Sequence, residues 1–152
     1  MHIDFAVSAF VTSADKTQTA LIFHHKFQKR IQPGGHVEPG ELPHEAALRE
    51  TKEELGLDAR MDPEVHTRDT DTSTQSYLVP NPIATYRSSV PVYKNVPAHI
   101  HCDFWYILIA DEKQPFEGEA NQSKRYTKEE VLAMPDDEIL SGARVMAKKW
   151  LI

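Results

Sequence analysis

The feature that most constrains this chain is a glycine-rich turn followed by an acidic helix, between Gln32 and Leu57. Pro43 suits the first turn of a helix, where its missing N–H costs nothing, and Gly56 suits the end. With about 100° of rotation per residue, one arc of this helix carries three acids, Glu50, Glu53 and Glu54. The neighbouring arc holds Ala47, Leu48, Thr51 and Leu55. We therefore expect one face to pack on a sheet and the adjacent face to present carboxylates to a cleft.

Three carboxylates at this spacing repel one another, and such pairs weaken an isolated helix. A divalent cation would reverse the sign of that interaction, and Mg²⁺ prefers oxygen ligands from carboxylates, waters and substrate phosphates. The alternative is a solvated acidic face, with Arg49 and Lys52 as neighbouring counter-charges. The helix alone leaves both interpretations open.

The surrounding residues favour the metal site, because Gly35 to Leu57 resembles the signature box of the Nudix hydrolases. That box reads G-x5-E-x7-R-E-U-x-E-E-x-G-U, where U is a bulky aliphatic residue. Glu41 and the run from Arg49 to Leu57 occupy its fixed positions, with one departure, Thr51, at the first U. Thr51 lies in the packing arc, so its hydroxyl is expected to bond a backbone carbonyl one turn back.

The resemblance implies the roles of the box residues. The carboxylates of Glu50, Glu53 and Glu54 would be metal ligands, and the carbonyl of Gly34 a further one, for Mg²⁺ or alternatively Mn²⁺. Arg49 would hold the carboxylates in place, and Glu41 would support the preceding loop. The expected catalytic residues are Glu53 as the base, Glu50 and Arg49, with Glu117 or Glu119 in a polar loop at 112–122 as alternative bases.

The reaction implied is hydrolysis of a diphosphate linkage, in which a nucleoside diphosphate is joined to another moiety, as in nucleoside triphosphates or nucleotide sugars. An alternative is a non-catalytic Nudix domain that senses a nucleotide or binds a partner. All box acids are present and the chain has 152 residues, which favours an enzyme. A Nudix-fold isomerase of isoprenoid diphosphates would need a catalytic cysteine, and Cys102 lies within an expected strand.

Substrate selection must come from residues outside the box. Arg30 could meet phosphates, although the base rate for exposed charges favours a solvated strand end. Trp105 could stack on a base, as could four other aromatic residues that are more often core: Phe27, Tyr77, Tyr86 and Tyr126. We take Arg30 and Trp105 as the expected substrate contacts.

His99, His101 and Asp103 share one face of a strand expected at 98–111. Histidines at this spacing can bind zinc, but no further Cys or His has supporting spacing in the sequence. We therefore expect this polar strand start to lie near the substrate cleft instead.

The remaining pattern predicts an α/β fold, and the resemblance implies the Nudix α/β/α sandwich around a mixed β-sheet, with residues 1–152 as a single domain and the box at 35–57. Strands are expected at 3–11, 19–25, 60–67 and 123–126, a broken strand or loop at 77–93, a short helix from Thr127 to Pro135, and a closing helix from Asp136 or Asp137 to Trp150.

The composition narrows the partners and the compartment. A net charge of −6 argues against a nucleic-acid surface, and no apolar run is long enough for a membrane span. One cysteine and no secretory signal favour the cytoplasm. We expect a small-molecule nucleotide substrate and a monomer or homodimer.

Overall fold

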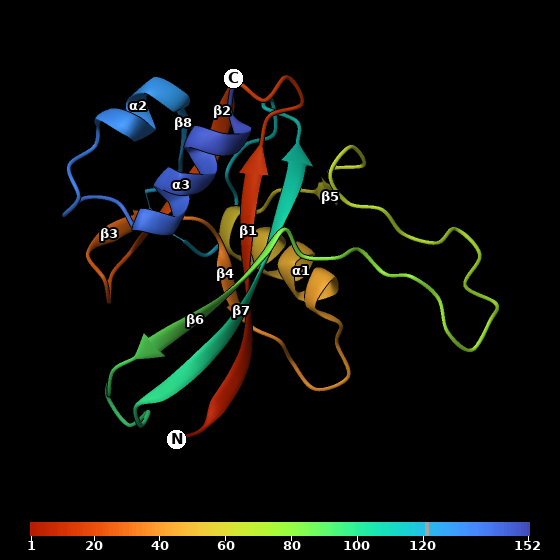
Figure 1. Cartoon of the computed structure of the whole chain (residues 1–152). Helices are drawn as coiled ribbons and strands as arrows, with labels where there is room; N and C mark the ends of the chain where they lie inside the picture. The colour runs from red at the N-terminus through yellow and green to blue at the C-terminus, as the bar shows by residue number, and fades with distance from the viewer. Residues whose placement is uncertain (121) are drawn as a thin grey trace.

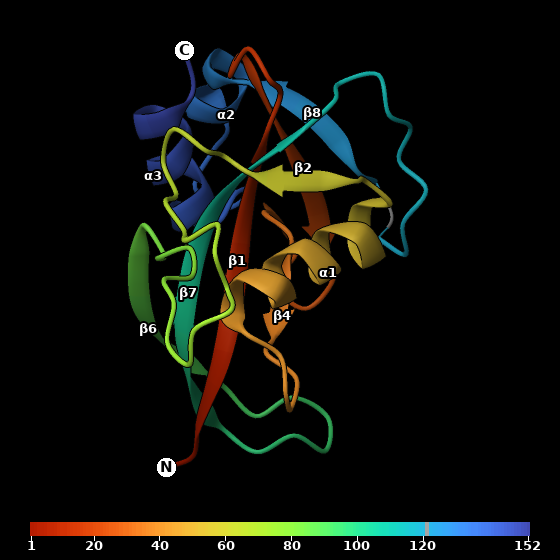
Figure 2. The same cartoon turned by 90° about the vertical axis from the view of Figure 1, so that its right-hand side faces the viewer.

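The computed structural model describes residues 1–120 and 122–152 as a three-layer α/β/α arrangement (Figure 1). Helix α1, Pro43–Leu55, covers one face of the sheet, and helices α2, Lys128–Ala133, and α3, Ser141–Trp150, cover the other (Figure 2). This is the predicted sandwich. Asn121, in the expected polar loop, lies outside the described residues.

In the described part of the chain the sheet is mixed and contains eight strands, with β3-β2-β1-β7-β5 as its main path. Strand β4 pairs with β1, β6 with β7, and β8 with β2. The strands are β1 Ile3–Thr12, β2 Gln18–His24, β3 Lys29–Ile31, β4 Gly34–His36, β5 Ala59–Met61, β6 Ala84–Val90, β7 His99–Ala110 and β8 Lys124–Thr127. All pairs are antiparallel except β1 with β7, which run parallel from Ile3 beside Ile100 to Thr12 beside Ile109.

Alternation along β1 and β7 divides the core into two layers. Toward α1, residues such as Val7 and Leu108 pack against Leu55 of the helix. On the opposite face, Phe10 and Ile107 pack against α3. Every residue from Trp105 to Ala110 is buried, as expected for a central strand covered on both faces. The acidic helix and the two late helices therefore lie on opposite sides of one sheet.

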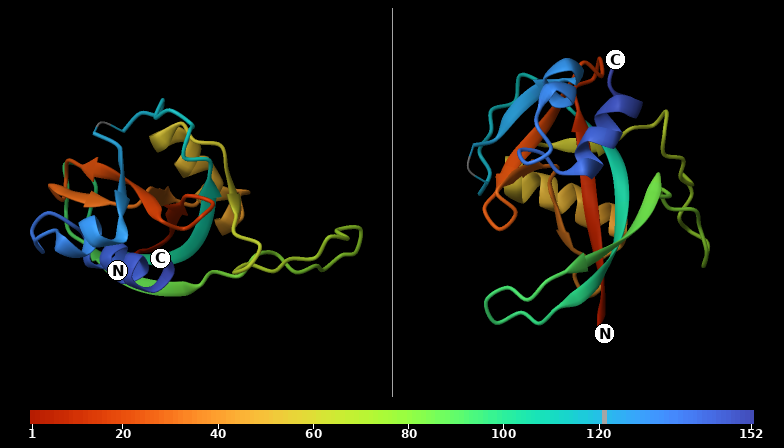
Figure 3. Two further views of the ribbon diagram at one scale, coloured as in Figure 1. Left: turned by 90° about the horizontal axis from the view of Figure 1, so that it is seen from above. Right: turned by 60° about the vertical axis from the view of Figure 1, so that its left-hand side comes forward.

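Two expected strands are shorter or displaced. The strand expected at 60–67 ends at Met61, because Asp62 starts a turn in which its carbonyl accepts the N–H groups of Val65 and His66. Within 77–93, Ala84–Val90 forms β6 beside β7, and the prolines of the segment lie outside that strand. From above, the long connection between β5 and β6 projects away from the body of the molecule (Figure 3).

The closing helix begins later than predicted. Residues 138–140 are not helical because their backbone pairs with β3: the N–H of Arg30 donates to the carbonyl of Glu138, and the N–H of Leu140 donates to the carbonyl of Arg30. Ile139 is thereby buried, and α3 starts at Ser141. Within residues 1–120 and 122–152, no helix has both the length and the apolar character needed to cross a bilayer.

Candidate active site

Helix α1 ends as its sequence predicts and carries the acids on a fixed register. Gly56 adopts a left-handed conformation, with φ 73°, and its N–H donates to the carbonyl of Lys52. Thr51 is fully buried, and its hydroxyl donates to the carbonyl of Ala47 at 2.8 Å, which confirms the expected bond one turn back. The departure from the family pattern therefore affects packing alone and leaves the acidic face intact.

The glycine turn lies directly against the acids. The N–H of Gly34 donates to Oε1 of Glu54 at 2.9 Å. A Cβ on Gly35 would lie 2.4 Å from Oε1 of Glu50, and one on Gly34 would lie 2.3 Å from the carbonyl oxygen of Val7. A side chain on Gly34 would therefore push β4 away from β1, whereas one on Gly35 would displace the carboxylate of Glu50.

Without a cation, burial and mutual repulsion disfavour the charged forms of Glu50 and Glu54. Burial, together with the charges of Glu50 and Glu53, raises the pKa of Glu54 to about 7, against the lowering effect of the Gly34 N–H. Burial likewise raises the pKa of Glu50, against the lowering effect of Arg49. A divalent cation would relieve both effects, so the donor set of oxygens fits Mg²⁺.

Arg49 connects four groups of this site. Its Nε and Nη2 donate to the two carboxylate oxygens of Glu41, and its Nη1 donates to Glu50 at 2.8 Å and to Glu53 at 3.1 Å. Nη2 also donates to the carbonyl of His36 at 2.9 Å. The bidentate bond to Glu41, opposed by desolvation, raises the pKa of Arg49. The guanidinium thus joins three segments: the end of β4 at His36, the loop that carries Glu41, and α1.

The loop that carries the alternative bases also lies against α1. The N–H of Glu117 donates to the carbonyl of Leu55, and the N–H of Glu119 donates to the carbonyl of Glu53 at 2.8 Å. These bonds satisfy carbonyls that a helix leaves free at its end. Both loop side chains are exposed, as is Glu53.

A pocket of about 240 Å³ adjoins the glycine turn on the sheet face opposite α1. It contains a hydrogen-bonded chain in which Gln32 Nε2 donates to the Ser8 hydroxyl, which donates to Asp103 Oδ2. The second oxygens, Oε1 of Gln32 and Oδ1 of Asp103, are buried and accept no hydrogen bond from the residues that the structure describes. Burial raises the pKa of Asp103. The pocket therefore offers acceptors to a ligand that carries N–H or O–H groups.

The two expected substrate contacts do not line this pocket. Arg30 lies in β3, where its Nε donates to the hydroxyl of Tyr126 at 2.7 Å. Trp105 is 3% exposed and packs in the core beneath α3, with its indole N–H donating to Asp103. The lining instead includes Phe27, which the sequence suggested as a candidate, and Lys26, which it did not. Both residues reach the pocket because of the path that the chain takes after β2, and the sequence pattern does not reveal that path.

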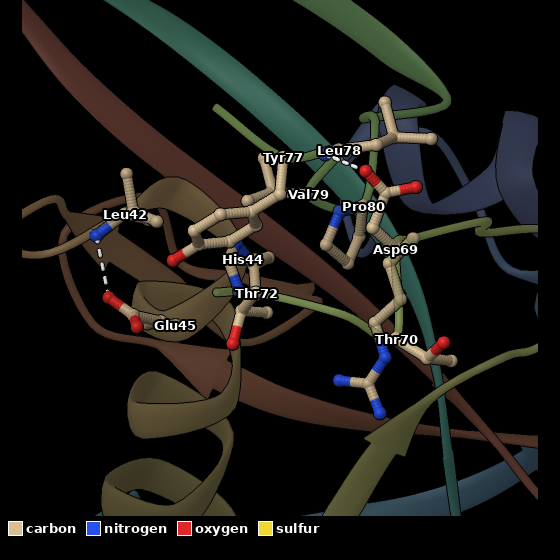
Figure 4. Close-up of a pocket in the computed structure, with 11 residues that line it drawn as sticks. Leu42, His44, Glu45, Asp69, Thr70, Thr72, Tyr77, Leu78, Val79 and Pro80 are labelled. Atoms are coloured by element: carbon tan, nitrogen blue, oxygen red, sulfur yellow. Dashed lines mark hydrogen bonds between the residues drawn. The ribbon is translucent and has the colours of Figure 1, made fainter. Parts of the chain in front are cut away.

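A second hollow, of about 500 Å³, lies between the start of α1 and the connection from β5 to β6. Figure 4 shows Tyr77 and His44 facing this space, with the N–H of Leu78 bonded to Asp69. None of the three acids of α1 contributes to its lining. Nor do they line the smaller pocket, which instead includes Gly34 and Gly35 of the turn that lies against Glu54 and Glu50.

The polar start of β7 is divided between two environments. Asp103 lines the smaller pocket, together with His101. His99 and His101 also converge with His36 and Asp4, whose ligand atoms all lie within 4.8 Å of one another. Whether this strand start lies near the substrate therefore stays a prediction, supported by the place of His101 and Asp103 in the pocket wall. Asp4 and His36 were missed because they come from other strands, far away in sequence.

Comparison with known proteins supports one family. A model of the NUDIX domain matches residues 3–146. A crystal structure of a NUDIX-family hydrolase from Clostridium perfringens is 31% identical, with a TM-score of 0.71, over 98% of this chain and 96% of that one. A search of curated proteins found no match.

Two more distant structures share the fold. The E. coli dihydroneopterin triphosphate pyrophosphohydrolase is 16% identical with a TM-score of 0.63, over 99% of this chain and 98% of that one. A NUDIX hydrolase from Nitrosomonas europaea is 17% identical with a TM-score of 0.58, over 96% and 86%.

Proposed function

This chain belongs to the Nudix family and is a pyrophosphohydrolase, and we propose that it cleaves a nucleoside diphosphate derivative in a Mg²⁺-dependent reaction. The substrate would be a nucleoside triphosphate or a nucleotide-sugar type compound, attacked by water at phosphorus. The observation that carries this proposal is the contact of the half-buried carboxylates of Glu50 and Glu54 with Gly35 and Gly34.

The residues of α1 would hold the metal. Glu50, Glu53 and Glu54 supply carboxylate oxygens, and the Gly34 carbonyl is a further proposed ligand. When bound, Mg²⁺ neutralises the diphosphate oxygens and acidifies a coordinated water. Mn²⁺ is the alternative ion, because it accepts the same oxygen ligands.

The protein's own groups would position and deprotonate the attacking water. Glu53 is the proposed base, because its carboxylate is 46% exposed and can reach solvent while Arg49 holds it at 3.1 Å. Arg49 also holds Glu50, and it is held in turn by both oxygens of Glu41. The exposed loop residues Glu117 and Glu119 remain the alternative bases, since their backbone bonds place them beside the end of α1.

The pocket beside the glycine turn would receive the ring system of the substrate. The free oxygens of Gln32 and Asp103 favour a ring with N–H donors, as amino-substituted purines, pyrimidines and pterins have. Phe27 could stack on such a ring, and Lys26 could meet its phosphates. One distant structural neighbour acts on a pterin triphosphate, which is consistent with this class.

A hydrolysis screen with Mg²⁺ would test the proposal. The panel is nucleoside triphosphates, oxidised nucleotides, dihydroneopterin triphosphate, ADP-ribose, dinucleoside polyphosphates and nucleotide sugars. We expect turnover of at least one compound, abolished by excess EDTA and restored by Mg²⁺ or Mn²⁺. Undiminished activity in EDTA would refute the metal requirement.

Variants would then assign the residues. Glu53→Gln and Glu54→Gln should each reduce kcat by about 100-fold or more, the scale of lost acid–base catalysis. Glu129→Gln, on the exposed start of α2, removes the same charge far from the acids and should leave kcat unchanged. If Glu53→Gln stays near wild type while Glu117→Gln or Glu119→Gln loses activity, the base lies in the loop.

A further inference from the structure

Four polar side chains from three strands converge at the start of the central strand pair. We call Asp4, His36, His99 and His101 the histidine cluster. The parallel register places Asp4 of β1 beside His101 of β7, and the antiparallel register places His36 of β4 beside Ala6. Alternation puts these positions, with His99, on the same face of the sheet. The cluster is thus fixed by strand register and involves none of the acids of α1.

The ligand atoms are spaced as around a single ion. Nε2 of His101 lies 2.8 Å from Nε2 of His36 and 3.0 Å from Nε2 of His99. Oδ2 of Asp4 lies 3.9 Å from Nε2 of His36 and 3.7 Å from Nε2 of His99. In tetrahedral coordination, with bonds of about 2.0–2.1 Å, neighbouring ligand atoms are about 3.3 Å apart. The four measured separations bracket that value.

Protons alone do not satisfy these contacts. The Nδ1 of His99 lies 2.9 Å from the carbonyl of Pro97, which can only accept, so Nδ1 carries the proton. In the neutral ring, Nε2 of His99 therefore points its lone pair toward the centre of the cluster. His101 has one Nε2 and meets two imidazole nitrogens, so a single N–H cannot serve both well. A cation at the centre would bind every lone pair at once.

The outer contacts resemble those that orient metal ligands. Ligating histidines usually donate their other N–H to a carbonyl or carboxylate, as His99 does to Pro97. Asp4 is held on its other oxygen by Nε2 of His2 at 2.5 Å. Arg49 holds only the backbone of His36, by donating to its carbonyl.

We propose that the histidine cluster is a second metal site, which binds one Zn²⁺-like transition-metal ion through three imidazoles and one carboxylate. Such nitrogen-rich sets select zinc and its neighbours, whereas Mg²⁺ prefers oxygen. Four protein ligands leave no open position, which is typical of structural rather than catalytic zinc. The ion would join β4 to β1 and β7, two residues from Gly34, and would stabilise the turn that carries the carboxylates.

Zinc binding by the full-length, chelator-treated protein tests this directly. Competition with a chromophoric chelator should show one tight Zn²⁺ site, and Co²⁺ should give the intense visible bands of tetrahedral coordination. His36→Asn and His101→Asn should each weaken Zn²⁺ binding by more than about 100-fold, since loss of even an outer partner costs about 10–100-fold. His36 is 54% exposed, so we expect His36→Asn to fold. It therefore tests the site even if substitution of the half-buried His101 prevents folding.

Matched controls separate this site from the carboxylates. His25→Asn changes an exposed histidine outside the cluster and should bind Zn²⁺ as the wild type does. A Glu53→Gln/Glu54→Gln double variant should also retain Zn²⁺ binding, even where hydrolysis is lost. The zinc site and the proposed function can therefore fail independently of each other. Zn²⁺ should raise the Tm of the wild type and not that of His36→Asn. Binding that survives His36→Asn and His101→Asn, or that disappears in the glutamate double variant, would overturn the second site.

Discussion

Arg49 donates two parallel hydrogen bonds to the carboxylate of Glu41, from Nε to Oε1 at 2.7 Å and from Nη2 to Oε2 at 3.0 Å. Glu41 precedes α1, and Arg49 lies within it, so this pair fixes the loop to the helix. The third guanidinium nitrogen remains available for Glu50 and Glu53. A planar, five-donor group is needed to make all of these bonds together.

Arg49→Lys should therefore lower kcat more than it lowers stability. Lysine keeps the charge but cannot bond both oxygens of Glu41 while reaching Glu50. Loss of charge-assisted hydrogen bonds of about 1.5–3 kcal/mol corresponds to roughly a 10–100-fold decrease in kcat. Steady-state kinetics and thermal melting of the same preparations would measure both effects. Unchanged kcat would show that Arg49 does not position the acids.

Gly35→Ala should disable the site while keeping the fold. The added methyl would meet Glu50 Oε1 at 2.4 Å, so the carboxylate must move away from its present position. We expect activity to fall by at least about tenfold, as misplacement of a reacting group typically causes. Circular dichroism and kinetics would check the two parts separately.

Gly40→Ala is the matched control for that variant. Gly40 has φ +82°, with nothing within 4 Å of an added Cβ. The alanine should reduce stability by about 1 kcal/mol through backbone strain and leave kcat unchanged. Equal losses of kcat in Gly35→Ala and Gly40→Ala would mean that the loss comes from backbone strain in this segment and not from displacement of the Glu50 carboxylate.

Thr51→Val should stabilise the protein slightly without changing catalysis. Valine retains the shape of threonine and removes a hydroxyl whose sole bond is to the carbonyl of Ala47, which the helix already uses. We expect the free energy of unfolding to rise by about 0.5–1 kcal/mol. Urea unfolding would measure it, and a loss of stability would indicate that the hydroxyl contributes more than its desolvation costs.

His66 should make folding stability sensitive to acid. Its Nδ1 donates to the carbonyl of Asn81, and its Nε2 accepts from the N–H of Ile107, so the ring is held neutral. Burial lowers its pKa below the ordinary 6.5, although the Asn81 bond and Asp62 oppose this. The unfolded chain then binds the proton more readily, so stability is full above pH 6.5 and decreases as the pH falls below it.

Urea unfolding between about pH 5 and pH 7 would measure that decrease. His66→Gln should flatten the slope, because glutamine can donate and accept without titrating in this range. Burial also lowers the pKa of His24 and His44, so part of the slope should remain. The exposed His25→Gln variant should keep the full slope. An identical slope in His66→Gln and wild type would contradict the assignment.

The sequence predicted the local features well, because they depend on residues close together in the chain. The limits of α1 follow from Pro43 and Gly56, and α2 lies within the short helix expected from Thr127 to Pro135. His99, His101 and Asp103 share one face of β7, as its alternation predicted. The bond of Thr51 to Ala47 also agrees with expectation.

Features that depend on distant segments were not predictable in the same way. The late start of α3 results from backbone pairing between Arg30 and residues near Ile139. The histidine cluster needs the register of three strands, so the spacing of His99 and His101 alone could not indicate His36 or Asp4. The pocket acceptors Gln32 and Asp103 likewise meet only through Ser8.

The parallel pairing of β1 with β7 has a consequence for synthesis of the protein. Ser8 and Asp103 are bonded although they are 95 positions apart. While the ribosome is still making the middle of the chain, β7 is not yet available to pair with β1. The apolar residues of β1 therefore stay exposed and can bind other proteins. Folding of the sheet must therefore wait until β7 has emerged, and such long-range closure is slow. A newly made chain would depend on protection during that interval, even though the finished sandwich buries residues 6–12 of the same strand.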